Sequence, residues 1–266
     1  MPLGLGTTQF WYDSTRETRE VFHEAAFSYG INVIDTAEMY GNSNKEVGKI
    51  LKQWGRENFY VIDKILPDNM TEENFMKSLR RSLNDLGTDY IDLYLLHWRE
   101  KADLNLLVEK MEEAKREGYI KEWGVSNIDV KDMEDLLKVK NGDKCYANEI
   151  MYNLFYRGVE YDLLPYLHER GIKPISYSTL DTRTSRNRTA ENKVLRKICE
   201  ENGICLEALM LAFAIRKYDL LAIFKTTTVE HLKENLKCLD FDIEPYMDII
   251  NEYYPAPTRK VPLEKR

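Results

Sequence analysis

Residues 31–41 read Ile-Asn-Val-Ile-Asp-Thr-Ala-Glu-Met-Tyr-Gly, and this stretch decides how the rest of the chain is interpreted. It begins as an apolar strand that ends at Asp35, and the loop that follows carries Tyr40 and closes at Gly41. A carboxylate at the end of a strand, followed by a phenol in the next loop, is suited to a site where a proton is delivered. The stretch therefore predicts a catalytic position at the end of a buried strand.

Two later segments end in the same way. Residues 59–64 and 91–97 are apolar strands whose last residues are Lys64 and His97. We expect these two side chains to join the carboxylate and the phenol at one rim of a barrel.

Around these segments the chain alternates strands with amphipathic helices, a pattern typical of a parallel sheet. Eight such units in this length predict a (β/α)₈ TIM barrel. An open doubly wound sheet would need a glycine-rich turn after the first strand, and Gly4 and Gly6 give only G-x-G. The expected strands cover residues 3–6, 31–35, 59–64, 91–97, 120–125, 146–150, 172–177 and 220–224.

Local signals set the expected helix ends. Ser14 is expected to cap the first helix because Glu17 stands three positions later, as a capping box requires, and Gly30 is expected to end it. Thr71 is expected to cap the helix that Gly87 stops.

Side chains alternate along a strand, so Asp63 should point away from the side that Lys64 faces. The positions that share a face with the two other strand-end residues are apolar, as the interior of a barrel requires: Ile31, Val33, Leu93 and Leu95.

The 266 residues carry a net charge of −7, which argues against nucleic acid or an anionic membrane as the main partner. We expect one domain, residues 1–266, with a short C-terminal tail from about residue 243, and a cytoplasmic location because no signal-peptide pattern opens the chain. Oligomeric state is left open. No metal site is expected, since the cysteines lack zinc spacing: Cys145, Cys199, Cys205 and Cys238.

The four converging residues suggest one chemistry. The pKa of a tyrosine is about 10 and burial raises it. An ammonium about 4 Å away favours the phenolate by up to about 4 kcal/mol, so we expect Lys64 to offset the burial of Tyr40 while Asp35 keeps the lysine charged. His97 would orient a carbonyl oxygen. None of these four side chains can supply the electron pair that reduces a carbonyl group, so a cofactor that carries hydride is implied.

At this point the sequence resembles the aldo-keto reductases over nearly its whole length. The motifs that carry the resemblance are Gly-Leu-Gly-Thr at 4–7, Ile-Asp-Thr-Ala-Glu-Met-Tyr-Gly at 34–41, residues 86–97 ending in Leu-Leu-His, Gly-Val-Ser-Asn at 124–127, residues 147–153 and residues 224–235.

The resemblance implies NADP(H)-dependent reduction of an aldehyde or ketone. It makes Tyr40 the general acid, tuned by Lys64 and Asp35, with His97 orienting the substrate carbonyl and Trp98 lining the substrate pocket. The implied cofactor contacts are Gly6, Thr7 and Asp35; Ser126, Asn127 and Glu149 on the carboxamide; Tyr177 on the nicotinamide ring; Ser178, Thr179 and Leu180 over the pyrophosphate; Lys225, Thr226, Thr227 and His231 on the ribose and its 2′-phosphate; and Glu234 and Asn235 on the adenine.

Two positions depart from the family pattern. Glu149 stands where the family usually has glutamine, and a carboxylate can accept from the carboxamide but cannot donate to it. We hypothesise that its charge favours the oxidised, cationic ring; an unchanged ratio of reduced to oxidised cofactor affinity in Glu149→Gln would contradict this. His231 replaces the usual arginine, so NAD(H) stays open as the cofactor and NADP preference rests on Lys225. Three arginines of the long loop could help: Arg183, Arg186 and Arg188.

The short N-terminus lacks the full leading hairpin of the family, so the barrel floor is expected to be partly open. Two other functions stay open. One is a cofactor-loaded regulatory subunit of the same fold with little turnover, which the intact set of four residues disfavours. The other is a sugar-phosphate isomerase on the same barrel, which would need a carboxylate in place of the tyrosine and lysine.

Overall fold

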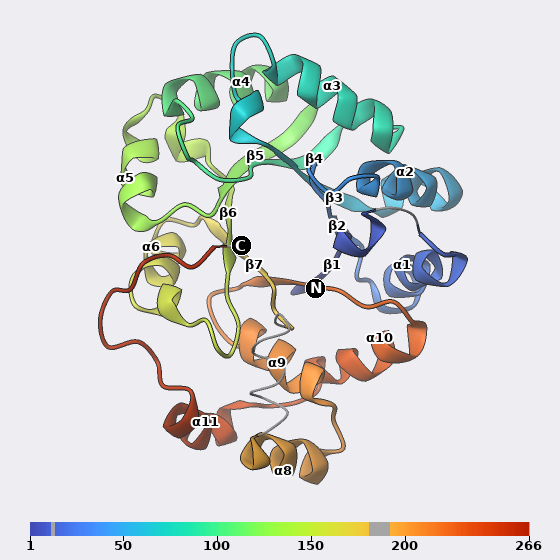
Figure 1. Ribbon diagram of the computed structural model, residues 1–266, viewed down its shortest axis with the longest axis vertical. Helices are drawn as coiled ribbons and strands as arrows, with labels where there is room; N and C mark the ends of the chain where they lie inside the picture. Colours follow the sequence, from blue (N-terminus) through green and yellow to red (C-terminus); the bar gives the residue numbers. More distant parts are fainter. Residues whose placement is uncertain (12–13, 181–191, 266) are drawn as a thin grey trace.

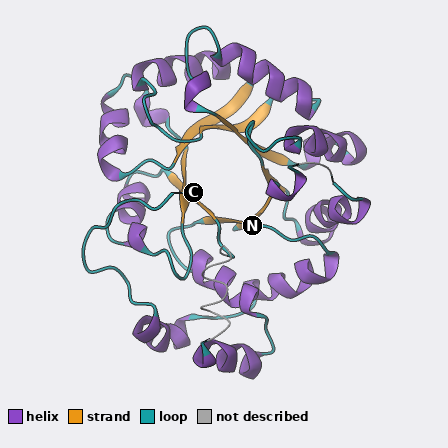
Figure 2. Ribbon diagram, in the orientation of Figure 1, coloured by secondary structure: helices purple, strands orange, loops and turns teal. Residues whose placement is uncertain are grey.

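A computed structural model describes residues 1–11, 14–180 and 192–265. Within them, eight parallel strands close into a barrel in the order of the sequence (Figure 2). The predicted (β/α)₈ barrel is therefore confirmed. The strands are β1 (Leu3–Gly6), β2 (Val33–Asp35), β3 (Tyr60–Ile65), β4 (Ile91–Leu96), β5 (Ile120–Ser126), β6 (Ala147–Met151), β7 (Lys173–Tyr177) and β8 (Leu221–Phe224).

Helices surround the barrel as a ring, and Figure 1 looks into this ring. Two of them, α8 and α11, lie at its outer edge in this view. None of the helices in the described part of the chain is both long and apolar enough to cross a bilayer. The helices are α1 (Arg16–Tyr29), α2 (Ser43–Trp54), α3 (Phe75–Leu86), α4 (Leu104–Arg116), α5 (Val130–Lys138), α6 (Leu163–Glu169), α8 (Lys193–Asn202), α9 (Leu206–Ile215), α10 (Val229–Leu236) and α11 (Met247–Tyr253).

Two predicted helix caps, Ser14 and Thr71, are not the residues that cap α1 and α3. Thr15 caps α1, because its hydroxyl accepts from the backbone N–H of Thr18 at 3.1 Å, while Ser14 is occupied by a hydrogen bond to Glu46. Thr71 lies one turn before α3, where it accepts from the N–H of Asn74 at 3.1 Å. Each prediction missed the cap by one to three residues, since Thr15 precedes α1 and Asn74 precedes α3.

The predicted helix ends at glycine are confirmed. Gly30 and Gly87 follow α1 and α3 with φ values of 68° and 65°, in the left-handed region where a glycine is least costly.

The barrel interior holds a small apolar cluster that is separate from the larger core between strands and helices. Its members include Leu93 and Leu95, with Val33 packed against it, as the alternation of side chains predicts. Ile31 is the exception: β2 begins only at Val33, and Ile31 lies in the outer core. Asp63 points outward, where it accepts a hydrogen bond from Asn44 at 3.3 Å.

After α11 the tail runs back along the barrel rim. The Nζ atom of Lys260 lies 3.1 Å from Asp129 at the start of α5 and 3.0 Å from Asp162 at the start of α6. These ion pairs hold the end of the chain against the loops that follow β5 and β6.

Candidate active site

The centre of the site is a buried ammonium between two carboxylates. The Nζ atom of Lys64, on β3, donates a hydrogen bond to Asp35 at the end of β2 and another to the carbonyl of Thr36 at 3.1 Å. The same atom lies 3.2 Å from Oε2 of Glu149 on β6. Lys64, Asp35 and Glu149 are 0%, 3% and 1% exposed, so water does little to screen their charges.

Tyr40 reaches this centre from the loop between β2 and α2. The centre of its ring lies 5.6 Å from Nζ of Lys64. The loop is fixed by Gly41, whose φ is 58° and where a Cβ atom would lie 2.3 Å from the carbonyl oxygen of Trp11. Asn42 donates its N–H to that same carbonyl at 2.9 Å. Any larger residue at position 41 would displace the phenol.

Glu38, within the same loop, was missed by the sequence interpretation. Its carboxylate accepts from the N–H of Leu66 and from the side chains of Asn69, Ser78 and Arg81. It thereby ties the Tyr40 loop to the loop after Lys64. A lone acidic residue between two proposed catalytic residues was the available signal.

His97 follows β4 and is 7% exposed. Its ring packs edge-on against Tyr40 with centroids 5.9 Å apart, and 4.9 Å from the ring of half-buried Trp98. Burial and, to a smaller extent, the nearby Lys64 charge lower the pKa of His97 to about 3. The imidazole is therefore neutral near pH 7, where it can donate or accept a hydrogen bond but cannot act as a cationic acid.

The pKa of Tyr40 differs from expectation. Burial raises it well above the ordinary value of a tyrosine; Lys64 lowers it, and the charges of Asp35 and Glu149 raise it again. The expectation that Lys64 offsets burial is therefore wrong in this structure, because burial outweighs the charge of Lys64 and two carboxylates share that charge.

Burial also raises the pKa values of both carboxyls, although Lys64 lowers each of them. The pKa of Glu149 rises to about 8, through burial and then the charge of Asp35. Asp35 has the direct hydrogen bond to Lys64, so Glu149 is the carboxyl that more readily holds a proton.

A hydrogen-bonded chain joins the predicted carboxamide residues to the site. Ser126 donates to the carbonyl of Glu149 at 2.9 Å. Asn127, at a φ of 58°, donates to the carbonyl of His97 at 3.1 Å and accepts from the hydroxyl of Tyr177 at 2.7 Å. The structure therefore brings these residues together with the four proposed catalytic residues.

The first turn and the loop after β7 are also tied to the barrel rim. Gly6 pairs with Asp35, and Thr7, which is 0% exposed, donates to the carbonyl of Asp35 at 2.9 Å. Ser178 has a φ of 52°, and buried Thr179 donates to the carbonyl of Ile223 at 2.8 Å. The side chains of Thr7 and Thr179 are thus engaged by the protein, which leaves the backbone of these turns as the part able to meet a cofactor. Leu180 is half-buried against the core.

The predicted phosphate and adenine residues lie after β8. Three of them are exposed, and Thr226 and Asn235 are buried. Glu234 is half-exposed and pairs with Lys237 at 2.7 Å. The exposed members are Lys225, Thr227 and His231. The three loop arginines, Arg183, Arg186 and Arg188, lie outside the described residues.

These residues fit a nicotinamide dinucleotide. Oε2 of Glu149 is buried and accepts no well-directed hydrogen bond from any residue that the structure describes. It therefore has capacity for a carboxamide donor beside Tyr177. An exposed lysine stands after β8, where barrels of this kind hold phosphate.

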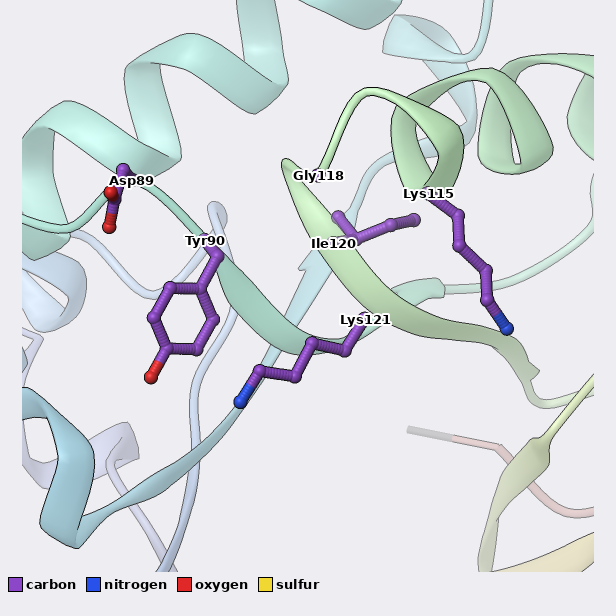
Figure 3. A pocket seen from close by; sticks show the side chains of 6 residues that line it. All are labelled: Asp89, Tyr90, Lys115, Gly118, Ile120 and Lys121. Carbon is purple, nitrogen blue, oxygen red and sulfur yellow. The ribbon is translucent and has the colours of Figure 1, made fainter.

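A pocket at the other end of the barrel is unrelated to this site (Figure 3). Its lining comes from the N-terminal ends of β4 and β5 and from the end of α4, and includes Tyr90, Lys121 and Lys115. A second pocket at that end is lined by Met1 and by interior residues such as Val33 and Leu93.

Comparison with known proteins identifies relatives over nearly the whole chain. The sequence model of the Aldo/keto reductase family matches residues 2–250. Methylglyoxal reductase YeaE of Escherichia coli (strain K12) is 34% identical over 267 residues, which cover 98% of this chain and 94% of that protein. Glyoxal reductase of Bacillus subtilis (strain 168) is 28% identical, with coverages of 90% and 83%.

A solved structure is similarly close. The aldo/keto reductase from Klebsiella pneumoniae in complex with NADP and acetate superposes with a TM-score of 0.92 at 33% identity, over 100% of this chain and 95% of that one.

Proposed function

This chain belongs to the aldo/keto reductase family and is an NADP-dependent oxidoreductase of carbonyl groups, and from that premise we propose that it reduces small aldehydes or ketones, 2-oxoaldehydes among them, with Tyr40 as the proton donor. The observation that carries the proposal is the meeting of Tyr40, Lys64, Asp35 and His97 at the C-terminal ends of adjacent strands.

The bound nicotinamide supplies the hydride. Burial raises the pKa of Tyr40, so the phenol is protonated in the resting protein and is a weaker acid than a tyrosine in water. As negative charge grows on the carbonyl oxygen, the proton moves from the phenol, and the Lys64 ammonium stabilises the phenolate left behind. Neutral His97 would donate a hydrogen bond to the same oxygen and orient it.

Cofactor binding is assigned to the two groups of residues described above. Ser126, Asn127 and Glu149 would hold the carboxamide, and Tyr177 would stack on the ring. Lys225 would pair with the 2′-phosphate. His231 lacks the permanent bidentate charge of an arginine, so NADH is the alternative cofactor to compare.

Support for 2-oxoaldehydes comes from the relatives, two of which are named for methylglyoxal and glyoxal. The half-buried indole of Trp98 beside His97 would narrow the space next to the reacting carbonyl, which favours a small substrate. The four cysteines carry no disulfide, which supports a reducing compartment such as the cytoplasm.

The test is a fluorescence titration of the purified protein with NADPH and NADH, followed by a panel of carbonyls at saturating cofactor. We expect tighter binding of NADPH and turnover of 2-oxoaldehydes above that of bulky ketones. Tight NADPH binding with no turnover of any carbonyl would instead support the regulatory subunit, and aldose–ketose interconversion without cofactor would support the isomerase.

A further inference from the structure

Glu149 is a buried carboxyl group, and the proposed reaction does not require a carboxyl group at this position. It lies on β6 between Ser126 of β5 and Ile175 of β7 in register. It is 1% exposed, and its Oε2 makes an ion contact of 3.2 Å with Lys64 without the geometry of a hydrogen bond.

The groups around Glu149 leave its charge only partly compensated. Among the residues that the structure describes, one cation, Lys64, faces two carboxylates, so these three groups carry one net negative charge when both carboxyls are ionised. Burial opposes such a charge, and a single added proton removes it. The titratable groups that face the cluster are Asp35 from β2, Tyr40 from the following loop, Lys64 from β3, His97 after β4 and Tyr177 from β7.

We propose that Glu149 is a proton-linked specificity residue, which with its proton serves the nicotinamide carboxamide as an amide would, and without its proton favours the oxidised ring over the reduced one. A protonated carboxyl offers one O–H donor and one carbonyl acceptor, the same pair that a glutamine presents to its partner. This inference rests on the proposed function, because it needs the nicotinamide to lie beside β6.

The charge of the cofactor makes the link measurable. The oxidised nicotinamide ring is a cation and the reduced ring is neutral. A nearby cation favours the ionised form of a carboxyl, so the oxidised cofactor should displace the proton of Glu149. Binding of the oxidised cofactor then releases a proton that binding of the reduced cofactor does not, and the affinity ratio should shift toward the oxidised form by up to about tenfold per pH unit as pH rises.

Isothermal titration calorimetry in buffers of different ionisation enthalpy counts these protons directly. NADP⁺ and NADPH are each titrated into the whole protein between about pH 7 and pH 9. Both carry the same adenine and 2′-phosphate, so the difference in proton release between them isolates the nicotinamide end. We expect a larger release with NADP⁺ in the wild type and no difference in Glu149→Gln.

Glu122→Gln is the matched control. Glu122 lies on β5, pairs with Lys115 at 2.6 Å and is 37% exposed, so the same chemical change there should leave the proton count of the wild type unchanged. Equal proton release for the two cofactors in the wild type overturns the inference, whether or not the variant folds. A difference that persists in Glu149→Gln also overturns it, since another group would then be the source. Failure of the wild type to bind either cofactor would instead refute the proposed function itself.

Discussion

Each end of this barrel holds a cluster of three charged side chains, and the two clusters have opposite ratios of cations to carboxylates. At the catalytic end one cation, Lys64, is shared by two carboxylates. At the floor one carboxylate, Asp92, is shared by two cations, since it accepts from Arg56 at 2.6 Å and from Lys121 at 2.8 Å, and also from the N–H of Val61 at 2.9 Å. Figure 3 shows Lys121 beside Tyr90, over whose ring both cations lie, at 4.0 and 4.2 Å from its centre.

The two clusters differ in how completely their carboxylate oxygens are hydrogen-bonded, not in the number of their charges. Every oxygen of Asp92 has a partner, and its lysine is largely exposed. The catalytic cluster is almost wholly buried, and no described residue gives Oε2 of Glu149 a directed hydrogen bond. A cluster whose carboxylate oxygens all have partners contributes to stability. A buried and unbalanced cluster with an unpaired oxygen, like the catalytic one, costs stability and shifts pKa values, which is the condition that proton chemistry requires.

Removing the lysine from each cluster should separate them most strongly. Lys64→Met leaves two buried carboxylates without a counter-charge, so we expect a loss of about 3–5 kcal/mol in the free energy of unfolding and near-complete loss of turnover. Lys121→Met removes a side chain that is 57% exposed, and Arg56 still faces Asp92, so the loss should stay within about 1 kcal/mol. Urea unfolding of both variants measures the contrast, and equal losses would contradict it.

The two tyrosines provide the next contrast. Tyr40→Phe keeps the ring but removes the proposed proton donor, so turnover should fall by about 10²- to 10⁴-fold while NADPH binding stays nearly unchanged. Tyr90→Phe makes the same change at the floor and should leave turnover at the wild-type level. Steady-state kinetics and a fluorescence titration check both. Parallel loss of binding and turnover in Tyr40→Phe would argue that the phenol is structural.

The unbalanced cluster should also make stability depend on pH. The pKa of Glu149 is raised above its value in an unfolded chain, so its contribution to stability is fully present below about pH 4.5 and is lost as pH rises through about 8. Glu149→Gln cannot ionise and should flatten this decline, becoming more stable than the wild type above pH 8. Thermal unfolding across this range is the measurement. A wild type whose stability does not fall between about pH 4.5 and pH 8 would show that the carboxyl stays ionised throughout.

The alternation of side chains was the part of the site most open to prediction. It placed Lys64 toward the barrel interior and Asp63 away from it, and it identified the apolar layer of Leu93 and Leu95. Periodicity of two is a geometric property of a strand, so it holds without knowledge of the neighbours. The prediction that Ile31 faces the barrel interior was wrong because β2 begins two residues later. Strand ends depend on pairing with a neighbouring strand, which the local sequence does not specify.

The electrostatics could not be predicted in this way. The effect of Lys64 on the pKa of Tyr40 depends on how many other groups share the charge of Lys64. One of these groups, Glu149 on β6, lies more than a hundred residues after Tyr40 in the sequence. The same holds for Glu38, whose four donors come from two separate segments, the loop after β3 and helix α3. A sum over long-range contacts decides these properties, whereas the order of strands and helices follows from local pattern.

Asp63 gives the smallest expected effect and the sharpest control, because it is the sequence neighbour of Lys64 on the outer side of the barrel wall. It is buried beside Asn44 and Ser82, has no cation paired with it in the described part of the chain, and burial raises its pKa to about 6. Its contribution to stability is therefore complete below about pH 4 and is lost as pH rises through about 6, by at most about 3 kcal/mol. Asp63→Asn should remove this loss and leave turnover unchanged, because the amide can keep the hydrogen bonds and the residue faces away from the site. Urea unfolding at pH 5 and pH 8, with kinetics at each, tests both statements; a large fall in turnover would mean that the two faces of the barrel wall are not independent.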